Sequence, residues 1–354
     1  MKPDYPARAS ALLAAALFPP AMALLAAMLI IAALGENPFT ALQTIFSGAF
    51  GSAESLGFTL YYATNFIFAG LAVSIPFRAG LFNIGVEGQA TVSGIGVALA
   101  ALNGGALAPI MMLPLVVAAG VAFGAAWAFL PAWLQVRRGS HIVITTILLN
   151  FIASALLAYL LVETLRAPGS MQPETQAFPP QALLPRASDW LPVGGAPLNA
   201  SFALALLAAL AAHVFITRTR AGYELRVAGA NPNAADYAGI PRMRTALLAM
   251  GAAGALASGI ALNELCGAQG RLILEFTGGY GFVGIAVALV GRSHAGGIVL
   301  AAILFGALYQ GGAELAFDRP RISRDLIVLV QGVVVLMVGC FSGRRLRLAA
   351  AKAA

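Results

Sequence analysis

Long apolar runs with almost no charge dominate this sequence and decide what it can fold into. Of its 354 residues, 60% are hydrophobic and 10% are charged, whereas a soluble globular domain carries about 25% charged residues. The runs approach the roughly 20 residues that a helix needs to cross a bilayer, and they lack the ~10-residue alternating pattern of a membrane β-barrel. The sequence therefore predicts an all-α membrane protein, built as a polytopic helical bundle.

We expect about ten transmembrane helices in a single domain that covers residues 1–354. The predicted spans are residues 11–34, 56–76, 86–102, 109–134, 142–162, 202–216, 245–265, 278–290, 296–314 and 325–341. The eighth is short and rich in glycine, which indicates a half-helix. Residues 36–55 and 163–200 are expected to form extracytoplasmic loops, and residues 218–244 a cytoplasmic one.

The distribution of basic residues sets the orientation. Of the 21 lysine and arginine residues, 15 fall on the inner side of this arrangement, and basic residues concentrate in the cytoplasmic connections of membrane proteins. Both termini are therefore predicted to be cytoplasmic. The net charge of +7 is explained by this orientation, so we expect the lipid bilayer as a partner and no nucleic acid.

Residues 77–89 interrupt the apolar pattern with polar side chains and three glycines. Polar groups at membrane depth are costly unless protein or water satisfies them, so this stretch predicts a broken helix near a transport pathway. Asn83, Glu87 and Gln89 are the candidate polar residues, and Glu87 is the only carboxylate that we place inside the hydrophobic region. Glu87 either faces the pathway or stabilises the broken helix, because ionisable groups inside membranes serve both functional and structural roles.

Residues 219–241 form a second informative stretch, longer than a simple connection needs. Asn231 followed by Pro232 can begin a short helix, and Gly239 followed by Pro241 can end it. A small helix on the cytoplasmic surface would fit a groove of a partner protein. The alternative is a basic loop with no partner.

Several classes of site have no support in the sequence. The only lysines, Lys2 and Lys352, are terminal, and no phosphate-binding G-x-x-x-x-G-K-[ST] motif occurs. The three histidines show no metal-ligand spacing, and the two cysteines form no C-x-x-C pair. No metal, no cofactor and no catalytic residue is expected, and an intramembrane enzyme would need a paired acid and base.

Three motifs resemble those of a known family. Asn233-Ala234-Ala235, followed after three residues by Gly239, resembles the coupling loop of ABC importer permeases, with Asn233 where an acidic residue usually stands. The flanking sequence is similar to permeases of the simple-sugar and nucleoside (ribose-permease-like) family. Residues 80–89 and 279–289 look closest to the purine nucleoside branch, and the resemblance covers residues 55–342.

The resemblance implies a permease subunit that works with other proteins in a bacterial cytoplasmic (inner) membrane. Its expected partners are a cytoplasmic ABC ATPase that hydrolyses the ATP, a second permease subunit that is often a paralogue, and an extracytoplasmic substrate-binding protein. The expected coupling residues are Asn231, Asn233, Ala234, Ala235 and Gly239. The expected pathway residues are Phe82, Asn83, Glu87, Gln89, Tyr280 and Phe282.

The function predicted on this basis is ATP-driven import of nucleosides, most readily purine nucleosides. A permease for a simple sugar such as ribose, or for a vitamin, is an alternative. An ion-coupled secondary transporter is a further alternative, but it would need several carboxylates within the spans.

Overall fold

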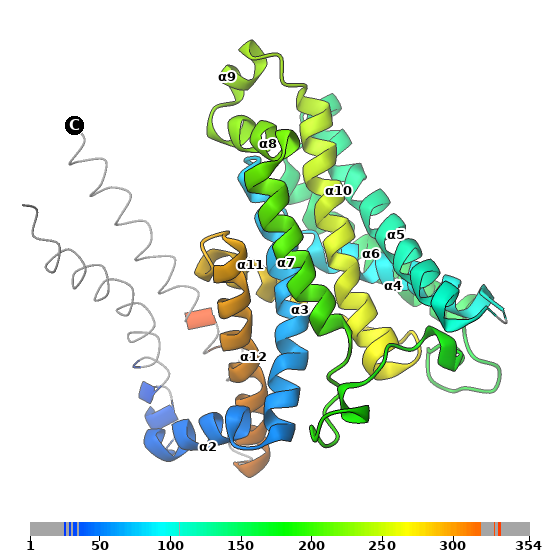
Figure 1. The fold of residues 1–354 in the computed structure, drawn as a ribbon, viewed down its shortest axis with the longest axis vertical. Coiled ribbons are helices and arrows are strands. Elements are labelled where there is room, and N and C mark those ends of the chain that lie inside the picture. Colours follow the sequence, from blue (N-terminus) through cyan, green and yellow to red (C-terminus); the bar gives the residue numbers. More distant parts are fainter. Residues whose placement is uncertain are drawn as a thin grey trace, which may run out of the picture.

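The described part of the chain is helical and contains no β-strand (Figure 1). The computed structural model describes residues 35–105 and 107–319, together with Leu25, Met28, Leu29, Ile31, Ala32, Ala33, Leu329, Gly332 and Val333. The α-helices are α2 (Pro38–Phe50), α3 (Ala53–Arg78), α4 (Val86–Asn103), α5 (Pro109–Arg138), α6 (Ile142–Glu163), α7 (Ser201–Arg218), α8 (Arg220–Ala230), α9 (Pro232–Tyr237), α10 (Arg242–Ala261), α11 (Tyr280–Val290) and α12 (Ala295–Asp318).

Six helices in this part of the chain are long and apolar enough to cross a membrane. They are α3, α5, α6, α7, α12 and the helix Arg242–Gln269, in which α10 continues into the π-helix η3 (Leu262–Gln269). Each coincides with a predicted span. Helix α4 forms at the predicted third span, and α11 has the 11-residue length of a half-helix. The spans predicted at 11–34 and 325–341 lie largely outside the described residues, so the count of ten and the side of the termini stay predictions.

Helix α3 lies at the centre of the bundle. In its most apolar 18-residue stretch 83% of the residues are buried, against 22% for α5 and for α7. It packs against α10, α11 and α12. Close packing elsewhere depends on small residues: Gly124 of α5 and Gly254 of α10 face each other, and neither leaves room for a Cβ atom.

Residues 36–55 were predicted to be a loop, and this prediction is wrong. They contain α2, whose first turn is capped by Asn37, because the Asn37 side chain accepts a hydrogen bond of 3.0 Å from the Phe39 amide. Pro38 occupies the first helical position, which proline favours. Helix α2 packs on α12, where Gly48 lies against the side chain of Glu314.

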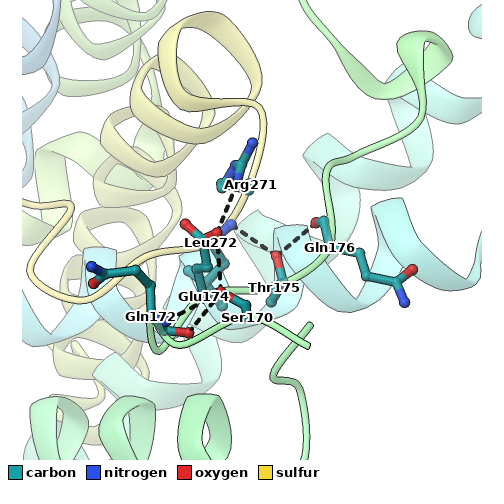
Figure 2. A network of polar contacts seen from close by, with 7 residues as sticks. All are labelled: Ser170, Gln172, Glu174, Thr175, Gln176, Arg271 and Leu272. Carbon is teal, nitrogen blue, oxygen red and sulfur yellow. Dashed lines mark hydrogen bonds and ion pairs between the residues drawn. The ribbon is translucent and has the colours of Figure 1, made fainter. Parts of the chain in front are cut away.

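Residues 163–200 form a loop that folds against the bundle through two 3-10 turns, η1 (Pro180–Ala182) and η2 (Ala187–Asp189). Figure 2 shows the polar network that ties this loop to the chain after η3. Glu174 pairs with Arg271 at 2.8 Å, and the Thr175 amide donates to the Leu272 carbonyl at 3.0 Å. Phe178 is buried in the same contact.

Candidate transport pathway and coupling segment

Residues 79–85 connect α3 to α4 and are largely buried. Helix α3 ends at Arg78, and Gly80 adopts φ +76°, a left-handed conformation that glycine reaches at no steric cost. Asn83 is fully buried, and its side-chain oxygen accepts a hydrogen bond of 2.9 Å from the Gly85 amide. The predicted interruption of the helical pattern at 77–89 is therefore confirmed, and its backbone is held by side chains.

The start of α4 is capped by a side chain from another helix. Its N-cap residue is Gly85, which has no side chain to offer. Asn150 of α6 accepts a hydrogen bond of 2.9 Å from the Gly88 amide and donates one of 3.0 Å to the Ile84 carbonyl. The first turn of a helix leaves several amide groups without intrahelical partners. Asn150 therefore holds α6 to the beginning of α4.

Glu87 performs the same task for α11. The N-cap residue of α11 is Gly279, at φ +77°, and again no side chain of its own caps the helix. The Glu87 carboxylate accepts hydrogen bonds from the amides of Gly279 at 3.0 Å and Gly281 at 2.8 Å. A carboxylate at a helix N-terminus is also stabilised by the helix dipole.

A cavity of about 950 Å³ lies between α4, α6 and the segment that precedes α11. It is named the transport cavity after the pathway predicted at this place. Glu87 and Asn150 both line this cavity, so the side chains that cap α11 and α4 also form part of its wall. Phe151 and Phe282 also line it, with 70% and 48% of their surface exposed. Its volume is at the upper end of the range of small-molecule sites, roughly 300–1,000 Å³.

Of the six predicted pathway residues, Glu87 and Phe282 line this cavity and the other four do not. Asn83 and Gln89 are buried and hydrogen-bond to each other at 3.3 Å, so their amides are used within the α3–α4 connection. Tyr280 packs on Phe66, with ring centroids 5.6 Å apart. Phe82 packs on Phe77 at 6.1 Å.

Glu87 was predicted to be the only carboxylate inside the hydrophobic region, and the structure places a second one, Glu264, inside the bundle. It sits in η3 and is buried. Its Oε1 atom accepts hydrogen bonds of 2.6 Å from the Tyr61 hydroxyl and from the Asn65 amide. The adjacent Asn263 donates to the Asn65 side-chain oxygen at 2.9 Å. The adjacent polar residues Asn263 and Glu264 near the end of an apolar span could have indicated a buried polar site. Their partners on α3 are about 200 residues away in the sequence.

The segment predicted to couple to an ATPase contains α8 and α9, which lie at one end of the bundle (Figure 1). Asn231 caps α9, since its side chain accepts hydrogen bonds from the amides of Asn233 at 3.0 Å and Ala234 at 3.1 Å. Ala235 is only 2% exposed and faces the bundle. Tyr237 is 96% exposed, and Gly239 ends the segment at φ +72°. Of the five predicted coupling residues, Asn231, Asn233, Ala234 and Gly239 are exposed, and only Ala235 is buried.

Helix α8 touches the α3–α4 connection directly. Gly229 lies so close to the Arg78 carbonyl that a Cβ atom would not fit, and the Cα of Gly229 lies 3.4 Å from the position of a Cβ on Gly80. An ion pair between Asp236 and Arg242 fastens α9 to the start of α10. The hydrogen bond from Arg242 lowers the pKa of Asp236, which keeps that carboxylate charged.

Comparison with known proteins identifies a family that matches this sequence. The family described as branched-chain amino acid transport system / permease component matches residues 55–339. The glucose ABC transporter permease protein TsgB13 of Haloferax volcanii is 34% identical over 90% of this chain and 86% of that protein. The nucleoside ABC transporter permease protein NupB of Lactococcus lactis is 32% identical over 88% of this chain and 86% of its own. The guanosine ABC transporter permease protein NupP of Bacillus subtilis is 32% identical over 90% of both chains.

Replacing Glu87 by glutamine tests the cap on α11. Glutamine has one acceptor oxygen where the carboxylate has two, so an amide of Gly279 or Gly281 loses its partner. We expect the free energy of unfolding to fall by about 1–3 kcal/mol, the cost of a buried donor left unpaired. Thermal unfolding of the detergent-purified chain measures this. Glu275→Gln is the control, because Glu275 is exposed at the rim of the same cavity; equal stability of the two variants would contradict the capping role.

Glu264 offers a pair of substitutions that separates shape from hydrogen bonding. Glu264→Gln keeps an oxygen that can accept from Tyr61 and Asn65, whereas Glu264→Leu leaves both donors unpaired in the bundle. We expect the leucine variant to lose about 2 kcal/mol or more of unfolding free energy and the glutamine variant less than about 1 kcal/mol. Thermal unfolding of the two variants measures this difference. A leucine variant as stable as the glutamine variant would show that the network does not depend on this acceptor.

Proposed function

The chain belongs to this permease family and is a multi-pass protein of the cytoplasmic membrane, and we propose that it is the membrane subunit of an ABC importer for nucleosides, with purine nucleosides preferred. The observation that carries the proposal is the 950 Å³ cavity, which combines exposed aromatic rings with polar groups. Two relatives of about one-third identity are named as nucleoside and guanosine permeases.

The lining of the cavity suits a nucleoside. The rings of Phe151 and Phe282 offer surfaces on which a base can stack. Asn150, Thr91 and Ser154 offer polar groups within reach of sugar hydroxyls. Asn150 already uses its amide to hold α4, so the polar contacts left for a ligand are few. Weak binding of this kind suits a conduit from which the substrate must leave.

A sugar is the second candidate substrate. TsgB13, with 34% identity, is named as a glucose permease, and a vitamin is represented by the probable riboflavin import permease protein RfuC of Treponema pallidum at 23% identity. Glucose would present only the C–H face of its puckered ring to Phe151 or Phe282, whereas a purine offers a larger planar surface to an aromatic ring. This difference favours a ligand that contains a base.

In the proposed mechanism, α9 docks on a cytoplasmic ATPase, and a second permease subunit and an extracytoplasmic binding protein complete the importer. Closure of the ATPase would move α9 and α8. The close contact of Gly229 with Arg78 and Gly80 passes that motion to the α3–α4 connection. Glu87 then passes it to α11 through the bonds to Gly279 and Gly281. Because Glu87 lines the cavity, access to the cavity changes with the same movement.

An ion-coupled secondary transporter is a weaker account. It would need carboxylates within the bundle that are free to exchange ions, and the structure adds the buried Glu264 to the half-buried Glu87. Both carboxylates already accept hydrogen bonds from fixed donors. Neither is arranged as an open ion site, and the exposed α9 has no role in such a transporter.

Uptake of labelled inosine tests the substrate class. Cells that lack the gene are compared with complemented cells, with unlabelled adenosine, ribose and glucose as competitors. We expect the gene to restore uptake, and excess adenosine to abolish it while the sugars leave it unchanged. Inhibition by glucose would assign the permease to sugars, and uptake that survives loss of the partner ATPase would indicate an ion-coupled transporter.

Tyr237 tests the coupling role of α9. Its exposed ring is the largest apolar group on that helix, and buried aromatic anchors dominate interface energies at about 2 kcal/mol or more. We expect Tyr237→Ala to reduce ATP-driven uptake at least about tenfold and to weaken co-purification of the ATPase, with the bundle still folded. Tyr237→Phe is the matched control and should retain uptake. Normal uptake by the alanine variant would contradict the assignment of α9 as the coupling helix.

A further inference from the structure

A second cavity, distinct from the transport cavity, lies where α3, α7, α8 and the α11–α12 connection meet. Its volume is about 310 Å³. The polar residues that matter in its lining are Arg78, His213, Thr217, Arg226, Ser293 and His294. Among the described residues that line it there is no aspartate or glutamate. We refer to it as the arginine cavity.

The two arginines that line this cavity each have one buried guanidinium nitrogen without a hydrogen-bond partner among the described residues. These nitrogens are Nε of Arg78 and Nη1 of Arg226. Arg78 is held in place, because its Nη2 donates to the Ser293 carbonyl at 2.8 Å. Ser293 and its neighbour Arg292 both have left-handed φ angles, 52° and 53°, which are uncommon for side chains other than glycine. Buried unpaired donors are costly and require a physical explanation.

Two histidines of the cavity and one helix N-terminus also offer hydrogen-bond donors. His213 and His294 lie with their ring centroids 5.4 Å apart, and every imidazole carries at least one N–H donor. Ala295 lines the cavity at the first turn of α12, a 24-residue helix whose N-terminus has no side-chain cap. Amide groups at such an end favour an anion. Guanidinium, imidazole and helix N-terminus thus converge on one space.

We propose that the arginine cavity binds a phosphate group, carried by an anionic phospholipid of the adjoining leaflet or by a soluble phosphate compound. Guanidinium groups match phosphate oxygens in geometry and charge. The lipid source has additional support from α7. Leu210 and Val214 are 60% and 45% exposed, and by their helical spacing they share a face with His213 and Thr217. An apolar surface for an acyl chain therefore runs along α7 to the cavity.

Ligand-induced stabilisation of the full chain in detergent tests the proposal. The probes are phosphatidylglycerol, diacylglycerol with the same acyl chains, and inorganic phosphate against chloride at equal ionic strength. A ligand that binds the folded state raises the unfolding midpoint. We expect phosphatidylglycerol to raise it in the wild type and in Arg220→Gln, and to bind Arg226→Gln at least about tenfold more weakly. Arg220 is the control because it lies on the same helix with a side chain that is 90% exposed.

The comparison among probes identifies the source of the phosphate. A response to phosphatidylglycerol alone assigns a lipid headgroup, and an equal response to inorganic phosphate assigns a soluble ligand. Equal responses of Arg226→Gln and Arg220→Gln, or an equal effect of diacylglycerol, would overturn the proposal.

If Arg226→Gln does not fold, a second pair of variants tests the proposal. His294→Glu places a carboxylate at the cavity, and His141→Glu makes the same change at the N-cap of α6. Both histidines are exposed, so folding should tolerate either change. We expect only His294→Glu to abolish the stabilisation by phosphate-bearing ligands, and identical behaviour of the pair would refute the site.

Discussion

Backbone groups at helix ends inside a bilayer must be satisfied by the protein itself, and this requirement organises the centre of the molecule. Helices α4 and α11 both begin on a glycine, which has no side chain with which to cap the helix. Asn150 supplies the acceptor for α4, and Glu87 supplies it for α11. Because Asn150 belongs to α6 and Glu87 to α4, hydrogen bonds link α6 to α4 and α4 to α11. The transport cavity lies beside these two links.

This arrangement couples the shape of the cavity to the position of α8. A side chain that both caps a helix and lines a cavity cannot move without moving the helix. The contact of Gly229 with the α3–α4 connection is backbone against backbone, so little side-chain flexibility absorbs a displacement there. Motion at the surface segment therefore has a short and stiff route to Glu87. The route needs no residue outside α8, the connection, α4 and α11.

Local patterns predicted the long membrane spans but not the pairings between them. The apolar runs predicted the six long spans, the polar stretch at 77–89 predicted the interruption before α4, and the glycine-rich run predicted the short α11. The partners of Glu87, Asn150 and Glu264 depend on which helices lie side by side, and one sequence does not contain that information. The α2 helix was missed although its Asn-Pro start is a local signal, because its low charge and position between spans favoured a loop.

Glu264 and Glu87 show why a position inside the bundle does not by itself assign a role to a carboxylate. Glu264 accepts hydrogen bonds from Tyr61 and Asn65 of α3 and does not line the transport cavity, so its bonds join α3 to η3 within the packed bundle. Glu87 accepts hydrogen bonds from the Gly279 and Gly281 amides and from the Thr277 side chain, and it lines the cavity. Displacing α11 would leave the Glu87 carboxylate at a cavity where water can solvate it, whereas displacing η3 would separate Glu264 from Tyr61 and Asn65 inside the packed bundle. We therefore expect movement to cost less free energy at α11 than at η3.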